Sequence, residues 1–297
     1  RWKPMTAPTV VEPVDDELTS STEPSSPESP RPRRRLRKVL IVVAAVLAVL
    51  VIAAGLWFFV GREQAEQLSD DQALEDFRAN SADASDAEGR PAAGVYAATA
   101  SGNESIGLPG FDEELGPNAP VTITYGDEGC FTYRADFNSH HWRSWTFCPS
   151  GTATFALTQL DSWTARKAPG LDLTTLTTYR CDQPLAFLWD GAATGDTRTG
   201  ACTGTSDMDD LVTEDAAQIV VLGTDTLTID GESVDVVRVR TTDTFSGDQT
   251  GSEVGNWWLD TTTGLPVKAD FEALLEGGPS TYSETIELAL STLTPVT

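Results

Sequence analysis

The chain has 297 residues and a formal net charge of −25, and the acidity is confined to one part of it. Residues 61–297 carry twelve Lys and Arg against thirty-nine Asp and Glu, whereas residues 1–38 carry eight against six. A surface this acidic repels the phosphate backbone, which excludes nucleic acid as a partner. It favours a soluble domain in the second part of the chain.

Residues 1–38 are rich in Pro, Ser, Thr and Glu, as in SSTEPSSPESPRP. Such a composition buries too little apolar surface to offset the entropy of the chain. The sequence therefore predicts a disordered tail, which ends in the basic cluster RPRRRLRK at 31–38.

Residues 39–60 form an uncharged apolar run of 22 residues. As a helix this run spans about 33 Å, enough for the hydrocarbon core of a bilayer. The basic cluster lies directly before it, so the positive-inside rule puts the tail in the cytoplasm and the acidic part outside. The run is too long for a cleaved signal peptide and ends in Trp57, Phe58 and Phe59, so we expect an uncleaved single-pass anchor in the cell membrane.

Residues 61–90 are interpreted as an acidic linker that begins with a helix-prone stretch. The apolar stripe of that stretch is thin, since it consists of Ala65, Leu68, Ala73, Leu74 and Phe77.

Residues 91–297 alternate apolar and polar side chains with the period of a β-strand. Examples are VTITY at 121–125, the two runs around Asp230-Gly231, a hairpin turning near Thr263-Gly264, and TYSETIELALSTL at 281–293. Helical periodicity is scarce, and the best short candidate is 209–221. The fold class expected is mainly β: one extracytoplasmic, antiparallel domain of about nine to eleven strands with few helices.

The four cysteines, Cys130, Cys148, Cys181 and Cys202, all follow the apolar run. An even number of cysteines in an oxidising compartment predicts disulfide bonds. Of the three possible connectivities we favour pairing between sequence neighbours, Cys130 with Cys148 and Cys181 with Cys202.

The stretch between Cys130 and Cys148 explains this choice. If these two cysteines face each other across an antiparallel hairpin, Asn138-Ser139-His140 becomes the turn and two aromatic pairs form on one face. The expected opposed pairs are Phe131 with Phe147, Tyr133 with Trp145, Ala135 with Arg143, and Phe137 with His141.

His140 and His141 are the only histidines of the chain, which raises the possibility of a metal site. Adjacent strand residues point to opposite faces, and oxidised cysteines offer no thiolate, so we expect turn residues and no metal. The nucleophile elbow, the zinc-protease motif, the phosphate loop and the dinucleotide fingerprint are all absent from the sequence. We therefore expect no cofactor, no catalytic residue and no enzymatic activity.

The aromatic face of the hairpin admits two interpretations. Phe131, Tyr133, Trp145 and Phe147 belong either to the core of the domain or to a surface that binds a ligand. We retain these four as the candidate ligand-binding residues.

The C-terminal part resembles the end of the bacterial lipoprotein-carrier superfamily, over residues 224–297 or so. The matching elements are Trp258 with Asp260, then Gly264-Leu265-Pro266, then Val267-Lys268-Ala269, and finally Leu293 to Pro295. The resemblance implies an open half-barrel with a helical lid on its concave face, and binding of lipid or lipoprotein without catalysis. Two features depart from the family pattern: a membrane helix in place of a cleaved signal, and two cysteine pairs.

The leading hypothesis is a non-enzymatic, membrane-anchored module that binds a lipid-like, lipoprotein or protein ligand outside the membrane. One alternative is a protein-interaction or signalling module that couples the outer domain to the cytoplasmic tail. A second alternative is a hydrolase of wall polymers that uses a pair of carboxylates.

Overall fold

The structure is a computed structural model that describes residues 33–61, 63–80, 89–107, 111–151, 153–207, 211–277 and 280–297. Most of the predicted tail (1–32) and part of the predicted linker (81–88) lie outside these ranges. By its internal contacts the chain divides into two units, Arg1–Ala54 and Gly55–Thr297.

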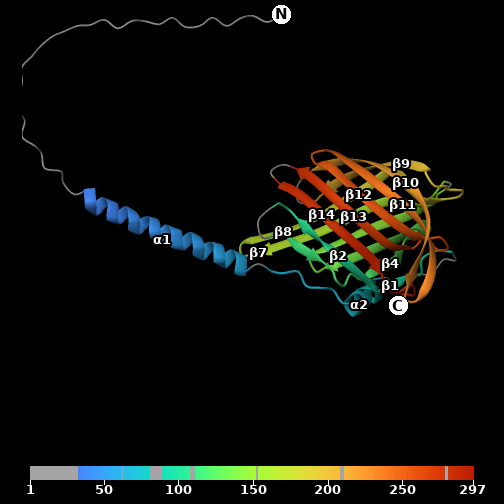
Figure 1. Cartoon of the computed structure of the whole chain (residues 1–297), viewed down its shortest axis with the longest axis horizontal. Coiled ribbons are helices and arrows are strands. Elements are labelled where there is room, and N and C mark those ends of the chain that lie inside the picture. The colour runs from blue at the N-terminus through green and yellow to red at the C-terminus, as the bar shows by residue number, and fades with distance from the viewer. Residues whose placement is uncertain are drawn as a thin grey trace, which may run out of the picture. The chain divides into compact units, whose positions relative to one another are not determined.

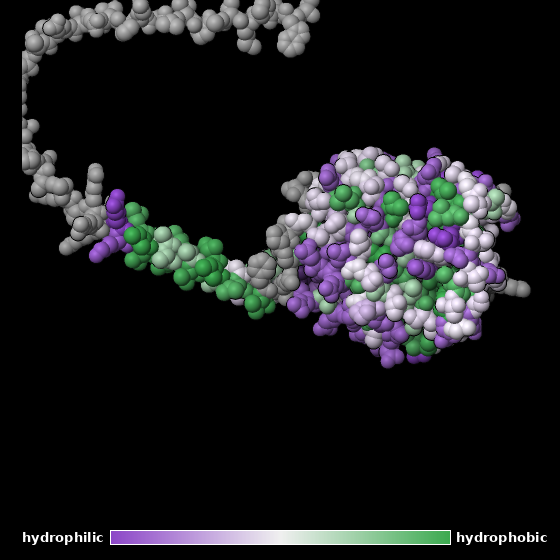
Figure 2. Space-filling view, in the orientation of Figure 1, coloured by the Kyte–Doolittle hydropathy of each residue, from purple (hydrophilic) through white to green (hydrophobic). Residues whose placement is uncertain are grey.

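Helix α1 (Arg33–Val60) contains the predicted apolar run and begins six residues earlier, within the basic cluster. Its segment Arg37–Phe58 has a mean hydropathy of 3.2, and none of its most apolar stretch is buried. Figure 2 shows α1 with a hydrophilic N-terminal end followed by a hydrophobic surface, in contrast to the mixed surface of the β domain. The described residues thus contain one helix that is long and apolar enough to cross a membrane.

The second unit is built on one antiparallel sheet of 14 strands (Figure 1). The strands are β1 Gly94–Tyr96, β2 Ala98–Ser105, β3 Glu113–Leu115, β4 Val121–Tyr125, β5 Phe131–Asn138, β6 His141–Ser150, β7 Ala153–Ala168, β8 Leu171–Trp189, β9 Thr197–Ser206, β10 Val212–Ile229, β11 Glu232–Gly247, β12 Thr250–Asp260, β13 Pro266–Gly277 and β14 Ser280–Leu290. The mainly antiparallel β class is confirmed, and the strand count exceeds the prediction.

The strand order is a long meander in which β4 to β14 are neighbours in sequence order. β1 lies beside β4 at one end, and β2 and β3 lie beside β14 at the other. The segment that leads into β4 also bonds to β2: Ala100 N donates to Pro117 O and Ala119 N donates to Ala98 O. These bonds bring the two ends of the strand order together, so the sheet curves around its own inner face (Figure 1).

The described part of the helix expected at 209–221 belongs almost entirely to strand β10, so that expectation was wrong; residues 209 and 210 lie outside the described ranges. Over this part the buried side chains of β10 are Thr213, Asp215, Ala217, Ile219 and Val221, which alternate with the two-residue period of a strand. Since two of the five are polar, hydrophobicity alone does not reveal the alternation.

Helix α2 (Asp70–Asn80) lies within the predicted linker and packs on the sheet. Ser69 and Gln72 form a capping box, in which each side chain accepts a hydrogen bond from the other residue's backbone N–H. Ala73 and Phe77 are buried against Ala93 and Val95.

The segment before α2, residues 63–69, is also bonded to the sheet. Glu63 N donates to Lys167 O, Ser139 N donates to Glu66 O, and Glu66 N donates to Ser139 Oγ. This segment, which we call the strap, is therefore part of the folded unit.

Both predicted disulfides are present, Cys130–Cys148 and Cys181–Cys202. The β5–β6 register agrees with the predicted one from Phe131↔Phe147 to Ala135↔Arg143. A bulge follows Asp136, so His141 faces Asn138 instead of Phe137, and the turn shortens to Ser139-His140. The β12–β13 turn contains Gly264, whose φ of +74° and close approach to the Phe155 ring leave no room for a Cβ.

Candidate functional site

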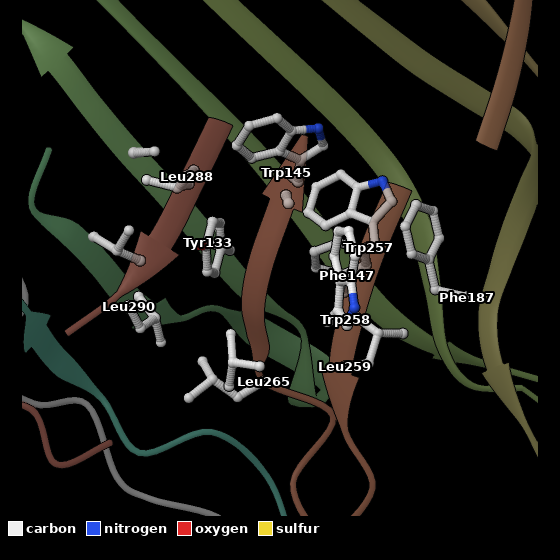
Figure 3. Close-up of a cluster of buried hydrophobic side chains, with 14 of the residues drawn as sticks. Tyr133, Trp145, Phe147, Phe187, Trp257, Trp258, Leu259, Leu265, Leu288 and Leu290 are labelled. Atoms are coloured by element: carbon white, nitrogen blue, oxygen red, sulfur yellow. The ribbon is translucent and has the colours of Figure 1, made fainter. Parts of the chain in front are cut away.

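The inner face of the sheet begins, at one end, with an aromatic core (Figure 3). It contains all four candidate ligand-binding residues, Phe131, Tyr133, Trp145 and Phe147, each at most 2% exposed. The two predicted cross-strand pairs exist, with ring centroids 5.3 Å apart for Phe131–Phe147 and 5.9 Å apart for Tyr133–Trp145. Trp257 covers Trp145 at 5.2 Å. The structure thus brings the four residues together inside the protein's own core.

Strand β6 continues the same face with two charged residues, Arg143 and His141. The His141 ring lies between two carboxylates: Nδ1 is 3.1 Å from Glu104 Oε2, and Nε2 is 3.3 Å from Glu284 Oε1. Glu104 and Glu284 are direct partners in the β2–β14 register, and all three side chains are almost completely buried. Like charges placed opposite each other repel, so the imidazole between them is the bridge that allows this pairing.

Two arginines complete this layer. Arg143 Nη1 is 3.0 Å from Glu284 Oε2, and Arg166 Nη2 is 2.5 Å from Glu104 Oε2. Arg166 Nη1 also contacts Glu113 at 3.3 Å. We call the set the ionic layer; its members are Glu104, Glu113, Glu284, His140, His141, Arg143 and Arg166.

The ionic layer connects to the strap through His140. His140 Nδ1 is 3.1 Å from Glu113 Oε1, and its Nε2 is 4.0 Å from Glu63 Oε1. The structure therefore places His140 in the turn, as the sequence predicted, but buries it, along with His141.

The protonation of the ionic layer follows from its contacts. Burial opposes ionisation of Glu104, but His141 and Arg166 outweigh it and lower the pKa of Glu104 to about 2. Burial likewise opposes protonation of His141, but Glu104 and Glu284 raise the pKa of the imidazole. Both shifts favour an ionised Glu104 paired with a charged imidazole.

A second buried group of charges lies on the neighbouring strands β10, β11 and β12. Asp243 is the direct register partner of Glu253, and Asp215 faces Phe245, one strand further. Burial, followed by the charge of Glu253, raises the pKa of Asp215 to about 7, and burial with both neighbouring carboxylates raises the pKa of Asp243 well above its ordinary value. We call Asp215, Asp243 and Glu253 the acidic corner.

Arg143 joins the acidic corner to the ionic layer, because its Nη2 lies 2.9 Å from Glu253 Oε2. Burial opposes the charge of this guanidinium, but Glu253 and Glu284 raise its pKa. Arg143 therefore stays charged between the two groups.

A cavity of about 300 Å³ opens beside both groups of charges. Its volume is at the lower end of the range of small-molecule sites. Its walls are of three kinds: apolar (Ile106, Leu160, Leu173, Phe245, Leu275), hydroxyl or amide (Ser162, Thr164, Thr175, Thr177, Tyr179, Tyr282, Gln249) and charged (Arg143, Arg166, Glu253, Glu284).

The cavity lies at a definable end of the sheet. Arg166 and Leu173, which line it, flank the turn between β7 and β8. The strap bonds to Lys167 beside this same turn, and Gly61 approaches Pro169 within it. The chain thus enters the β domain at the cavity end.

Sequence reasoning missed most of this site. One signal was present: Glu284 lies two residues before Ile286, on the predicted inner face of the last strand, so alternation places a carboxylate inside. Arg143 is likewise in register with the aromatic face of its hairpin.

Within the described ranges, no group of three or more His, Cys, Asp or Glu is arranged to hold a metal ion. The buried carboxylates around His141 are occupied by arginines instead.

No family model matches the chain, and neither a curated protein nor a solved structure was found that matches it.

Proposed function

We propose that this protein is a membrane-anchored, extracytoplasmic binding module whose ligand is an amphiphile of the lipid class. The observation that carries the proposal is the cavity, which combines an apolar wall with buried charges at its base. Such a site suits a molecule with one apolar and one polar end. The half-barrel implied by the resemblance to the lipoprotein-carrier superfamily belongs to the same proposal, and the curvature of the sheet supports it.

The topology in this proposal has helix α1 as a single-pass anchor with its basic end in the cytoplasm. The apolar surface of α1, the basic cluster before it and the two disulfides after it all support this orientation. Since only residues 61 and 62 separate Val60 from Glu63, the three residue steps between them place the start of the strap within about 11 Å of the helix end. In this proposal a lipid is taken up or handed on at the end of the β domain where the strap joins it.

Binding is favoured over hydrolysis by the pairing of the cavity's carboxylates. Glu253 and Glu284 both line the cavity, but both are bonded to Arg143. The same guanidinium bridges the two carboxylates, so no scissile bond can lie between them as a hydrolytic pair requires.

The test is to fill the cavity and measure the lipid that copurifies with the protein. Thr175 lines the cavity, whereas Thr174 of the same strand is exposed, so Thr175→Trp and Thr174→Trp form a matched pair. We expect mass spectrometry of extracts from the full chain in nanodiscs to find a defined lipid enriched over empty nanodiscs. Thr175→Trp should abolish the enrichment and Thr174→Trp should not. Equal enrichment in both variants, or none in the native chain, would refute the proposal.

A second candidate function, signalling across the membrane, is favoured by the contacts of the strap. Glu63 reaches His140, which contacts Glu113 and through it Arg166 at the cavity. Occupancy of the cavity could thereby alter the segment that leads to α1. Hydrogen–deuterium exchange tests this: Thr175→Trp should change the protection of residues 63–69, and Thr174→Trp should leave it unchanged.

A further inference from the structure

The two groups of buried charge differ in their balance. Apart from His140, the ionic layer has three carboxylates, Glu104, Glu113 and Glu284, against two arginines and the imidazole of His141, so these six side chains are neutral together when all six are charged. The acidic corner adds three more carboxylates, and the cation that contacts it is Arg143, which the ionic layer already uses. The surplus of negative charge therefore lies at the acidic corner.

The acidic corner also holds an unsatisfied group. Asp215 is 9% exposed, and among the described residues its Oδ1 has no hydrogen-bond partner. A buried carboxylate in this condition costs free energy unless a proton or a cation neutralises it. Protonation of Asp215 and Asp243 removes this unfavourable charge, in agreement with their raised pKa values.

The cavity meets this corner at Glu253, which is one of its lining residues, whereas Asp215 and Asp243 are not. Phe245, the register partner of Asp215, is another lining residue. Tyr179 completes this side, with its ring 5.7 Å from that of Phe245. Aromatic faces attract organic cations, particularly where water is scarce. Carboxylates and aromatic rings thus meet on one wall.

An anionic head group would find a less favourable site. The two cations of the cavity, Arg143 and Arg166, are each bonded to two carboxylates. An anion would have to displace one of these carboxylates, which would then be buried without a partner.

We propose, on the basis of the binding function above, that the cavity selects an amphiphile whose head is an organic cation of the ammonium type. The cationic head lies against Glu253, whose neighbours in the sheet are Asp243 and, one strand further, Asp215, and the apolar part of the amphiphile lies against Leu160, Leu173 and Leu275. The bound ammonium group keeps its own protons. Its charge replaces the protons held by the acidic corner, and these are released to the solvent.

Octylamine and octanoate are suitable probes because they are water-soluble and matched in chain length. An alkylammonium keeps its charge below about pH 9, as lysine does. Calorimetry on the full chain in phosphatidylcholine nanodiscs, with empty nanodiscs subtracted, should show octylamine binding at least ~10-fold more tightly than octanoate at pH 7.5. Repeating the titration in buffers of different ionisation enthalpy should reveal proton release.

The dependence on pH gives a second readout. The groups that face Asp215 and Asp243 from the neighbouring strands are Glu253, Arg143 and Tyr179. As the pH rises from 5.5 to 8 the corner loses protons that compete with the ligand, so the affinity for octylamine should increase.

The double variant Asp215→Asn, Asp243→Asn should weaken octylamine binding about 10-fold and remove the pH dependence. It mimics the protonated corner, so the fold should persist, and a thermal melt checks this. Asp225→Asn, at an exposed position of β10, is the matched control.

Tighter binding of octanoate, or octylamine binding that the double variant leaves unchanged, would overturn the choice of a cationic head and leave the proposed function intact. If neither probe binds and no lipid copurifies, both the choice of a cationic head and the proposed function are refuted.

Discussion

The ionic layer and the acidic corner place carboxylates on the same inner face, yet the two groups are neutralised in different ways. Glu104 has His141 and Arg166 as close partners, and they hold its pKa near 2 despite full burial. Asp215 has Glu253 as its charged neighbour, and its pKa is raised to about 7. The carboxyl group is thus ionised at neutral pH in Glu104, whereas Asp215 holds its proton up to a pH of about 7. The neighbours, and not the burial that both share, decide which.

The two groups therefore differ in what we expect of them: the ionic layer contributes to stability, and the acidic corner contributes to the proposed binding. A layer whose charges balance has no need of a ligand, and it holds β2, β6, β7 and β14 together. A corner whose charges do not balance is less stable as it stands and gains from any cation that enters.

Removing the carboxylate of Glu104 should have the largest effect. Glu104→Gln keeps the shape of the side chain but takes one of two carboxylate partners from each of the buried cations His141 and Arg166. We expect a loss of about 5 kcal/mol in the free energy of unfolding, measured by chemical denaturation. The exposed Glu114→Gln, on β3, is the control and should change it by less than about 0.5 kcal/mol. A small loss for Glu104→Gln would show that the ionic layer does not stabilise the fold.

The aromatic end of the inner face provides the apolar reference. Trp257→Ala removes a ring that packs against Trp145, Phe187 and Phe271, and should cost about 4 kcal/mol. Trp142 stacks on Trp163 and is only partly buried, so Trp142→Ala should cost about 1 kcal/mol. Equal losses for the two variants would contradict the assignment of Trp257 to the core.

The effects of the two disulfides on stability can be compared directly, because the bridges close loops of similar length. Replacing Cys181 and Cys202 by Ala should cost about 3 kcal/mol, and the same change at Cys130 and Cys148 should cost about as much. Cys202 is the register partner of Asp215, so a further loss confined to the Cys181–Cys202 variant would show that this bridge also positions the acidic corner. Denaturant titration of both double variants provides the measurement.

The smallest effect should be a gain in stability at the acidic corner. A carboxyl group whose pKa is raised on folding stabilises the protein below its unfolded pKa, and this contribution is lost as the pH rises through the folded value. For Asp215 the loss runs from about pH 4 to pH 7. Asp215→Asn should therefore stabilise the protein by about 1 kcal/mol at pH 8 and flatten the decline. Denaturation at pH 5 and pH 8 tests this; a destabilised variant at pH 8 would refute it. Glu104 acts in the opposite direction, since its contribution is lost as the pH falls from about 4.5 towards 2.

Local features of the fold were predictable from the sequence. The spacing of Cys130 and Cys148 set a register that also paired Phe131 with Phe147 and Tyr133 with Trp145, and the structure has these pairs. The turns at Asp230-Gly231 and Gly264 were likewise expected from residues that tolerate positive φ. These features depend on residues close to one another in the chain.

Non-local features were not predictable in this way. β7 and β8 are 16 and 19 residues long, and their inner faces carry Ser, Thr and Arg where they line the cavity, so hydrophobic alternation fades there. The ionic layer joins Glu104 of β2, Arg166 of β7 and Glu284 of β14, which meet only because the sheet curves. No sequence pattern within a single strand indicates that these three side chains lie close together.

The paired hydrogen bonds between Glu66 and Ser139 have a practical consequence for producing the β domain without its anchor. A fragment that starts at residue 91 would lack the strap and α2, and would expose Ala93 and Val95, which α2 covers. The shortest fragment that lacks α1 and keeps α2 and all the bonds of the strap starts at Glu63, whose N–H donates to Lys167 O. A protease that separated the β domain from α1 would have to cut before that residue to leave the same contacts in place.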